Sequence, residues 1–193
     1  DGLFMNQHRV EASDARHFQS AERLLINRAL DAAVIETSAR HILDEGLAYD
    51  RCKVGIVTNM PDTDEVLMDK HDIRTNDNMR TVIRTQVDVV LPEGAAVLNA
   101  DEPVVAGLAE LCDGEVIFYT RDHDNATLKE HLAKGGRAVY CRNGEVALAR
   151  GDQETLLFPL SLDLIARLLK DGLQISTLLA AVAAAWALDI APL

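Results

Sequence analysis

Polar side chains follow four short apolar runs of this chain, at the positions where the runs end. In chain order, the residues with suitable chemistry are Glu36, Asn59, Asn99, Asp101 and Arg121. Carboxylate and carboxamide oxygens are ligands that Mg²⁺ accepts, and a guanidinium pairs with a phosphate. These residue types indicate a site for a magnesium-bound anion, provided that the fold brings the ends of the runs together.

Each of these side chains also has a structural interpretation. An Asn or Asp after a strand commonly caps the next helix, which is the alternative for Asn99 and Asp101. Glu36 is harder to explain in this way, because it follows its apolar run directly. A further acidic group at 62–65, which includes Asp64 and Glu65, either takes part in the site or lies in a solvated loop.

The apolar runs have the length of buried parallel strands and are separated by helical patterns. The strands are expected at 32–35, 54–58, 95–98 and 116–119, and the helices at 20–30, 38–45, 76–90, 103–111 and 127–133. Continuous apolar runs are typical of strands that are covered on both faces. Alternation of strand and helix predicts right-handed βαβ units, whose ligands bind at the carboxyl ends of the strands where the strand order reverses.

The pattern changes after residue 134. Three short strand-like runs at 137–142, 145–150 and 155–160 are joined by Asn143-Gly144 and Gly151-Asp152, and Asn-Gly is a strong hairpin signal. Two helices at 162–169 and 176–188 are expected to close the chain, whereas residues 1–19 are expected to be an extended segment and loop.

The predicted fold class is α/β, a mostly parallel doubly wound sheet with a small antiparallel ribbon. It is expected to form a single domain over 1–193, with a parallel part at 20–134, the ribbon at 135–160 and closing helices at 161–193.

The composition limits the classes of partner. The chain has 193 residues and a net charge of −12, which argues against nucleic acid and anionic membrane surfaces as partners. No apolar run reaches the ~20 residues of a membrane span. Three widely spaced cysteines are typical of free thiols in a reducing compartment, so a cytoplasmic protein is expected.

The phosphate-binding loop G-x-x-x-x-G-K-[ST] does not occur in the sequence. Without its backbone amides and its lysine, an ATP site of that kind is incomplete. We therefore expect that this chain does not hydrolyse ATP by itself.

Several blocks of the sequence, taken in order, resemble the central domain of the Mur ligase family, in its cyanophycin synthetase branch. The block Leu98-Asn99-Ala100-Asp101 is shared by Mur ligases, whereas Ile42-Leu43-Asp44-Glu45-Gly46-Leu47 points to the cyanophycin branch. Further blocks lie at 57–59, 72–75, 119–122 and 179–186, so that the similarity spans about residues 20–190.

The resemblance implies a P-loop-like fold and an ATP-dependent amide ligase. In that chemistry a carboxylate is phosphorylated to an acyl phosphate, which an amine then attacks; in cyanophycin synthetase, arginine is joined to a polyaspartate backbone. It also implies Mg²⁺ at Glu36, with Asp64 and Glu65 as further metal positions. Asn59, Asn99 and Asp101 would line ATP, and Arg121 would contact its phosphates.

The sequence departs from the family pattern at several points. Asp64-Glu65 replaces an Asp-His pair, and no lysine occurs between Lys70 and Lys129. The family's phosphate loop would precede Asp1 and its C-terminal domain would follow Leu193, which predicts a fragment that is inactive alone.

Two other hypotheses stay open: a degenerate structural or assembly module, and a free-standing domain that binds an acidic or nucleotide ligand. The expected partners are a small or peptide-like acidic substrate, flanking domains of the same polypeptide, and a second copy through an exposed sheet edge.

Overall fold

The computed structural model describes residues 2–5, 8–12 and 16–190, which form two compact units. The first unit consists of residues 1–50 and 61–82, and the second of residues 51–60 and 83–193. The single domain expected from the sequence stays a prediction.

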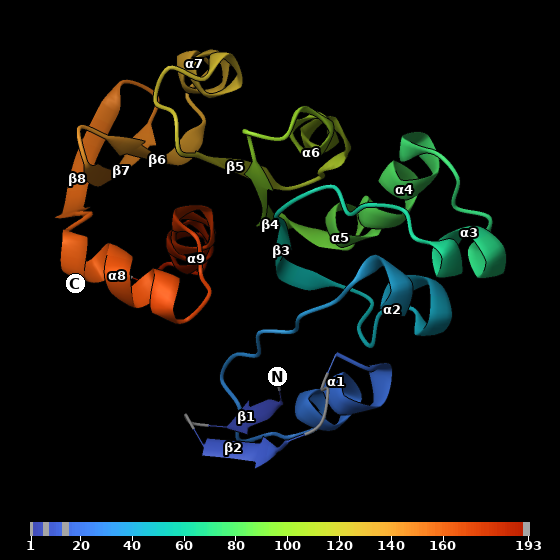
Figure 1. Cartoon of the computed structure of the whole chain (residues 1–193). Coiled ribbons are helices and arrows are strands. Elements are labelled where there is room, and N and C mark those ends of the chain that lie inside the picture. The colour runs from blue at the N-terminus through green and yellow to red at the C-terminus, as the bar shows by residue number, and fades with distance from the viewer. Residues whose placement is uncertain (1, 6–7, 13–15, 191–193) are drawn as a thin grey trace. The chain divides into compact units, whose positions relative to one another are not determined.

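The second unit is built on a six-stranded sheet in which neighbours in space are also neighbours in sequence (Figure 1). The strands are β3 (Cys52–Val57), β4 (Val90–Asn99), β5 (Glu115–Thr120), β6 (Arg137–Arg142), β7 (Glu145–Arg150) and β8 (Gln153–Pro159). The pairs from β3 to β6 are parallel, and the pairs from β6 to β8 are antiparallel. The α/β fold class and its antiparallel extension are thus confirmed, and β6 belongs to both parts.

Helices cover both faces of this sheet. They are α5 (Thr85–Asp88), α6 (Pro103–Ala106), the 3₁₀ helix η1 (Gly107–Leu111), α7 (Ala126–Ala133), α8 (Leu162–Lys170) and α9 (Ile175–Ala187). Helix α9 lies on one face, and α5, α6 and α7 lie on the other (Figure 1). The carboxyl ends of β3, β4 and β5 therefore meet at one edge between two helical layers.

The main core lies between α9 and the central strands. Val97, Ile117 and Val139, one from each of three neighbouring strands, are fully buried against Leu179 and Ala183 of α9. The small residues of α9 let the helix approach the sheet closely, and burial of each large aliphatic side chain contributes roughly 1.5–3 kcal/mol. This layer holds the strand ends in register.

The first unit contains a two-stranded sheet and short helices. Its elements are β1 (Leu3–Met5), β2 (His8–Glu11), α1 (Phe18–Leu25), α2 (Ala39–Glu45), α3 (Glu65–His71) and α4 (Asn76–Ile83), whose last residue falls in the second unit. The Ser38 hydroxyl accepts a hydrogen bond from the His41 amide and so caps α2. Gly46 ends this helix with φ of 79°, a value that favours glycine.

Several predictions about the first half of the chain are wrong. Residues 32–35 form no strand, and Val34 is 90% exposed. The helix expected at 76–90 is divided into α4 and α5, after which β4 begins at Val90. The helix expected at 103–111 becomes 3₁₀ after one turn. Of the acidic group at 62–65, Asp62 and Asp64 lie in exposed loop as the structural alternative expected, and only Glu65 falls in α3.

Among the described strands of the six-stranded sheet, the order in space follows the order in sequence, so the sheet has no reversal point among them. The segment 1–19 contains the β1–β2 hairpin rather than loop alone, although residues 1, 6–7 and 13–15 lie outside the described residues.

In the part of the chain that the structure describes, no single helix has the length and apolar character needed to cross a membrane. Helices α8 and α9 reach that length and apolar character only when they are taken together, and the two are bent by 98° relative to each other.

Candidate functional site

The carboxyl ends of β3 and β4 are joined by the side chain of Asn99. Its Nδ2 donates a hydrogen bond of 2.8 Å to the Thr58 carbonyl, and its Oδ1 accepts one of 3.0 Å from the Asp101 amide. Asn99 is only 7% exposed, so both ends of its amide are satisfied inside the protein. This residue fixes the path of the loop that carries Asp101.

Asp101 links the end of β4 to the end of β5. Its Oδ1 accepts a hydrogen bond from the Thr120 hydroxyl. Its Oδ2 accepts from the Arg121 amide at 3.2 Å and from Arg121 Nε at 3.4 Å. The alternative in which Asn99 or Asp101 caps the next helix is wrong, because α6 begins after Glu102 and has no side-chain cap.

Arg121 is held at this edge by one part of its guanidinium. Its side chain is 64% exposed, and Asp101 is its ion-pair partner among the described residues. The contact with Asp101 is made by Nε. The two terminal guanidinium nitrogens remain able to donate hydrogen bonds to solvent or to a ligand. The arrangement can therefore donate to an anion at the edge.

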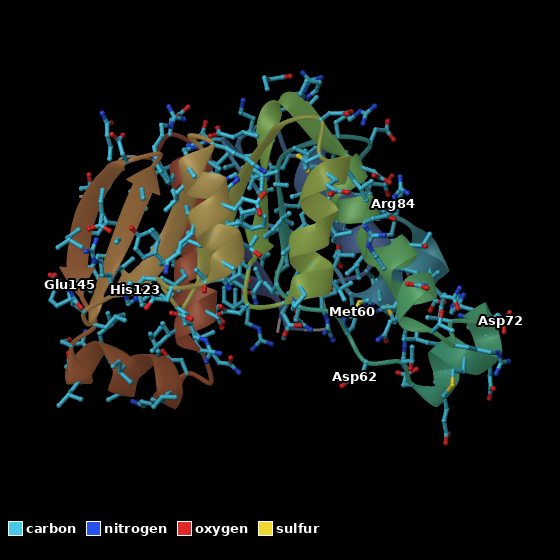
Figure 2. The ribbon with its side chains drawn as sticks, turned by 90° about the horizontal axis from the view of Figure 1, so that it is seen from above. Met60, Asp62, Asp72, Arg84, His123 and Glu145 are labelled. Atoms are coloured by element: carbon cyan, nitrogen blue, oxygen red, sulfur yellow. The ribbon has the colours of Figure 1, made fainter. Side chains whose placement is uncertain are left out.

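Two further residues support the edge. Asn125 caps α7 by accepting from the Leu128 amide, and its Nδ2 donates to the Ala100 carbonyl at 3.0 Å. Asn59 is exposed, and its Oδ1 accepts a 2.8 Å hydrogen bond from the Thr58 hydroxyl. The edge runs on past β5, since Met60, His123 and Glu145 all lie along it (Figure 2).

Tyr119 and Thr120 belong to this site, although the sequence analysis did not single them out. The Tyr119 hydroxyl donates to the Thr58 carbonyl at 3.4 Å, beside the Asn99 contact. Burial, with smaller effects of Asp101 and Glu102, raises the pKa of Tyr119 well above its ordinary value. Tyr119 therefore acts as a neutral donor. The only signal for these residues in the sequence is a hydroxyl at the end of an apolar run.

The other predicted site residues, Glu36, Asp64 and Glu65, belong to the first unit. Glu36 lies in irregular chain, its side chain is 76% exposed, and its carboxylate is 3.9 Å from Arg16. Asp64 caps α3, and Glu65 occupies the first turn of that helix.

Both oxygens of Asp64 already have partners. Oδ1 accepts from the Leu67 amide and Oδ2 from Arg40, each at 2.8 Å. The Leu67 amide, and after it Arg40, lower the pKa of Asp64 against the opposing effect of desolvation. To ligate a cation, this carboxylate would have to release Arg40.

The three predicted metal positions do not form a shared ligand set. Among the described residues, the one group of three candidate ligands whose atoms lie within 4.8 Å of one another is Asp122, His123 and Asp124. These residues are exposed, and Asp124 pairs with Lys129 at 2.6 Å. Glu36, Asp64 and Glu65 thus do not fit a common Mg²⁺ site in this structure.

The block at 42–47 has structural contacts in the first unit. Asp44 accepts from Lys70 and from His71, each at 2.6 Å, and the Lys70 bond is the main cause of its lowered pKa. Glu45 accepts from the Phe18 amide at 2.7 Å, which lowers its pKa further than the nearby His17 does. The acids of this block connect α2 to α1 and to α3.

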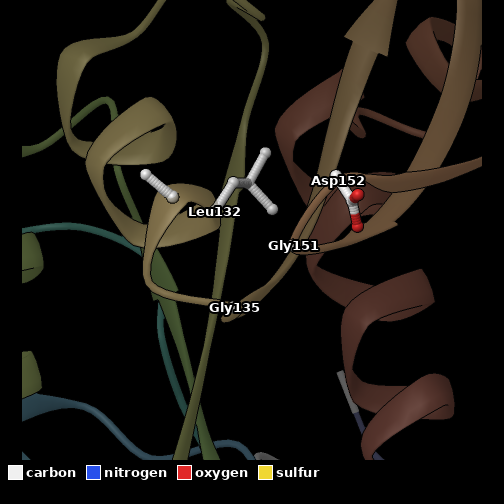
Figure 3. Close-up of a pocket in the computed structure, with 5 residues that line it drawn as sticks. Leu132, Gly135, Gly151 and Asp152 are labelled. Atoms are coloured by element: carbon white, nitrogen blue, oxygen red, sulfur yellow. The ribbon is translucent and has the colours of Figure 1, made fainter.

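A pocket of about 360 Å³ lies at the opposite edge of the sheet, between the end of α7 and the β7–β8 turn (Figure 3). It is lined by Leu132, Ala133, Gly135, Gly151 and Asp152. Arg150, which precedes the turn, pairs with Arg137 at the start of β6, so the pocket is at the amino ends of the parallel strands. It is separate from the Asn99–Asp101–Arg121 cluster.

The structure thus places Asn99, Asp101 and Arg121 at the carboxyl ends of parallel strands, the side on which open α/β sheets bind their ligands. No protein-family model matches the chain. Curated relatives do match it, and they share one name.

A cyanophycin synthetase of Synechocystis sp. is 34% identical over 84% of this chain, and one of Crocosphaera subtropica is 35% identical over 78%. A cyanophycin synthetase of Trichormus variabilis is 33% identical over 79%. The chain is therefore close to the cyanophycin synthetase family over most of its length. It spans 16–19% of the length of these three relatives.

Proposed function

We propose that this chain supplies nucleotide contacts in an ATP-dependent ligase of the cyanophycin synthetase type. The observation that carries the proposal is Arg121, which Asp101 holds through Nε at the carboxyl edge of the sheet; its side chain is 64% exposed, and within the described part of the chain its terminal guanidinium nitrogens have no hydrogen-bond partner. The similarity to cyanophycin synthetases supports the same proposal.

The reaction proposed for the whole enzyme has two steps. A carboxylate oxygen attacks the terminal phosphorus of ATP, which gives an acyl phosphate and ADP. An amine then attacks the acyl carbon, the C–O bond to phosphate breaks, and the amine loses a proton to leave an amide. We propose a polyaspartate-like carboxylate as the acid and arginine as the amine.

The residues of the second unit have distinct parts in this proposal. Arg121 pairs with nucleotide phosphates, because its terminal nitrogens are the exposed donors at the edge. Asp101 holds Arg121 in place, and Asn99 holds the loop of Asp101. Asn59 adds an exposed amide beside the end of β3.

Magnesium would neutralise phosphate charge in such a reaction. The Glu36 side chain is 76% exposed and its carboxylate is 3.9 Å from Arg16, a long ion-pair contact, so we propose it as a Mg²⁺ ligand. Asp64 and Glu65 remain proposed as metal positions, although both have structural roles in α3. Glu36, Asp64 and Glu65 do not form a shared ligand set among the described residues, so no step of the reaction is assigned to a metal ion.

We also propose the partners and the location of the protein. The proposed partners are an acidic peptide-like substrate, flanking parts of the same polypeptide and a second copy of the chain, and the proposed location is the cytoplasm. The degenerate structural module is the second candidate, because Asp64 serves as a helix cap and its carboxylate is occupied by Arg40.

Calorimetric titration with Mg²⁺-ATP tests the proposal. We expect Arg121→Ala to weaken binding by about ten-fold, or ~1.4 kcal/mol. Arg150→Ala is the matched control, because Arg150 is also exposed and paired to a carboxylate but lies at the opposite edge. Glu36→Ala should weaken binding with Mg²⁺ present and have no effect without it. Equal binding by all variants, or none by the unmutated chain, favours the structural module.

A further inference from the structure

Thr120 is the last residue of β5 and is completely buried. Its hydroxyl has two acceptors within reach, Asp101 Oδ1 and, at 3.3 Å, the Asp122 carbonyl, and it accepts a 3.0 Å hydrogen bond from the Asp122 amide. A threonine hydroxyl has one proton to donate, and an ionised carboxylate can only accept. Asp101 Oδ1 lies nearer to the hydroxyl than the Asp122 carbonyl does, so the proton is directed at Asp101.

The two oxygens of Asp101 are fixed from different parts of the β5 end. Thr120 contacts Oδ1, and the Arg121 amide contacts Oδ2. Two donors on two oxygens define the plane of the carboxylate. Arg121 Nε then meets a carboxylate with a single orientation, at 3.4 Å from Oδ2.

We propose that Thr120 is a positioning residue that fixes the Asp101 carboxylate and, through it, the Arg121 guanidinium. The purpose of this arrangement rests on the proposed function, in which Arg121 meets an anionic ligand. Thr120 itself is buried and does not reach that ligand. The arrangement orders the guanidinium before a ligand arrives, which lowers the entropy lost on binding.

Valine has nearly the shape of threonine but no hydroxyl, so Thr120→Val removes the donor to Asp101 with little change in volume. Thr120→Ser keeps the donor and is the rescue variant. Thr81→Val is a control for loss of a threonine hydroxyl, since exposed Thr81 of α4 donates to the Asp77 carbonyl.

The measurement is the exchange rate of the Arg121 Nε proton by NMR, with the signal assigned by its loss in Arg121→Lys. We expect exchange about ten-fold faster in Thr120→Val, roughly the effect of one lost hydrogen bond. Thr120→Ser and Thr81→Val should keep the rate of the unmutated chain. An unchanged rate in Thr120→Val overturns the proposal.

A second measurement needs no variant, in case Thr120→Val fails to fold. In the unmutated chain, the Thr120 hydroxyl proton should exchange at least about ten-fold more slowly than that of exposed Thr81. Equal rates overturn the proposal. Both readouts are independent of nucleotide, so failure of Mg²⁺-ATP to bind contradicts the proposed function while leaving the role of Thr120 to be decided by these rates.

Discussion

At the scale of single residues, Gly136 lies where no side chain fits. A Cβ at this position would be 2.2 Å from His131 Nε2, and the whole imidazole edge lies within 2.5 Å. The ring cannot move freely, because Nε2 is 3.1 Å from the carbonyls of both Val116 and Arg137. It also meets Phe118 edge to face at 4.8 Å.

We therefore expect Gly136→Ala to lower the free energy of unfolding by roughly 1–3 kcal/mol, through displacement of His131 and loss of its hydrogen bonds. Urea denaturation measures this effect. Gly107→Ala is the matched control, since a Cβ there meets nothing within 4 Å, and it should be neutral or slightly stabilising. Equal stability of the two variants would contradict the account of Gly136.

His131 also predicts a pH dependence. Carbonyls only accept, so Nε2 carries a proton in these contacts. Burial lowers the pKa of His131 below its ordinary value, against the opposing effects of the Arg137 and Val116 carbonyls. As the pH falls through about 6.5, the unfolded state therefore binds protons that the folded state does not, and stability decreases.

Urea denaturation between pH 7.5 and 5.5 should show this decrease in the unmutated chain. His131→Gln should have a smaller slope over the same range. The paired carboxylates, such as Glu154, have lowered pKa values and lose their contribution only at lower pH. A steeper slope in His131→Gln would refute the assignment.

The sequence placed Asn99, Asp101 and Arg121 at neighbouring strand ends, and the structure brings these three together. That prediction needed only strand direction and the fact that parallel strands end at one edge. The prediction did not include Thr120 and Tyr119, because the sequence of an apolar run does not indicate which of its hydroxyl groups contacts a carboxylate. The role expected for Glu36 rested partly on a strand at 32–35 that does not form.

At the scale of elements, β5, β6, β7 and α9 are joined by a buried arginine. Arg137 of β6 donates from Nε and Nη2 to Glu115 of β5, at 2.7 and 2.6 Å. Its guanidinium lies 4.8 Å from the centre of the Trp186 ring on α9. Arg150 of β7 contacts the same Glu115 at 3.5 Å but is exposed.

Replacing Arg137 and Arg150 one at a time distinguishes the contribution of a buried ion pair to stability from that of an exposed one. Arg137→Ala should lower the free energy of unfolding by roughly 2–3 kcal/mol, somewhat less than for a fully buried pair because Glu115 is partly exposed. Arg150→Ala should cost less than about 1 kcal/mol. Chemical denaturation of the two variants measures the difference, and similar losses would show that the α9 and β5 contacts of Arg137 contribute little.

Strands were easier to predict in the second half of the chain than in the first. The runs at 95–98 and 116–119 each find parallel neighbours, and Asn143-Gly144 forms the expected hairpin turn. The run at 32–35 looks the same in sequence, yet a strand exists only where a partner supplies hydrogen bonds. The hydrophobic pattern of a segment indicates that it can pair as a strand, but it does not show that a neighbouring strand is present.

At the scale of the whole molecule, burial is unevenly divided between the two units. The largely buried strands β4, β5 and β6 lie in the second unit, whereas β2 of the first unit is largely exposed. Hydrogen exchange should therefore be slowest in β4, β5 and β6 and fastest in β1 and β2. Mass spectrometry of peptic fragments measures it, and uniform protection across both units would contradict this division.

The central claim is that a nucleotide binds at the carboxyl edge of the second unit. The most direct test is to titrate isotope-labelled chain with Mg²⁺-ATP and follow the amide signals by NMR. The account predicts shifts centred on Asn99, Asp101, Thr120 and Arg121, and their loss in Arg121→Ala. Shifts centred on Gly135, Gly151 and Asp152 at the opposite edge, or no shifts at millimolar ATP, would contradict it.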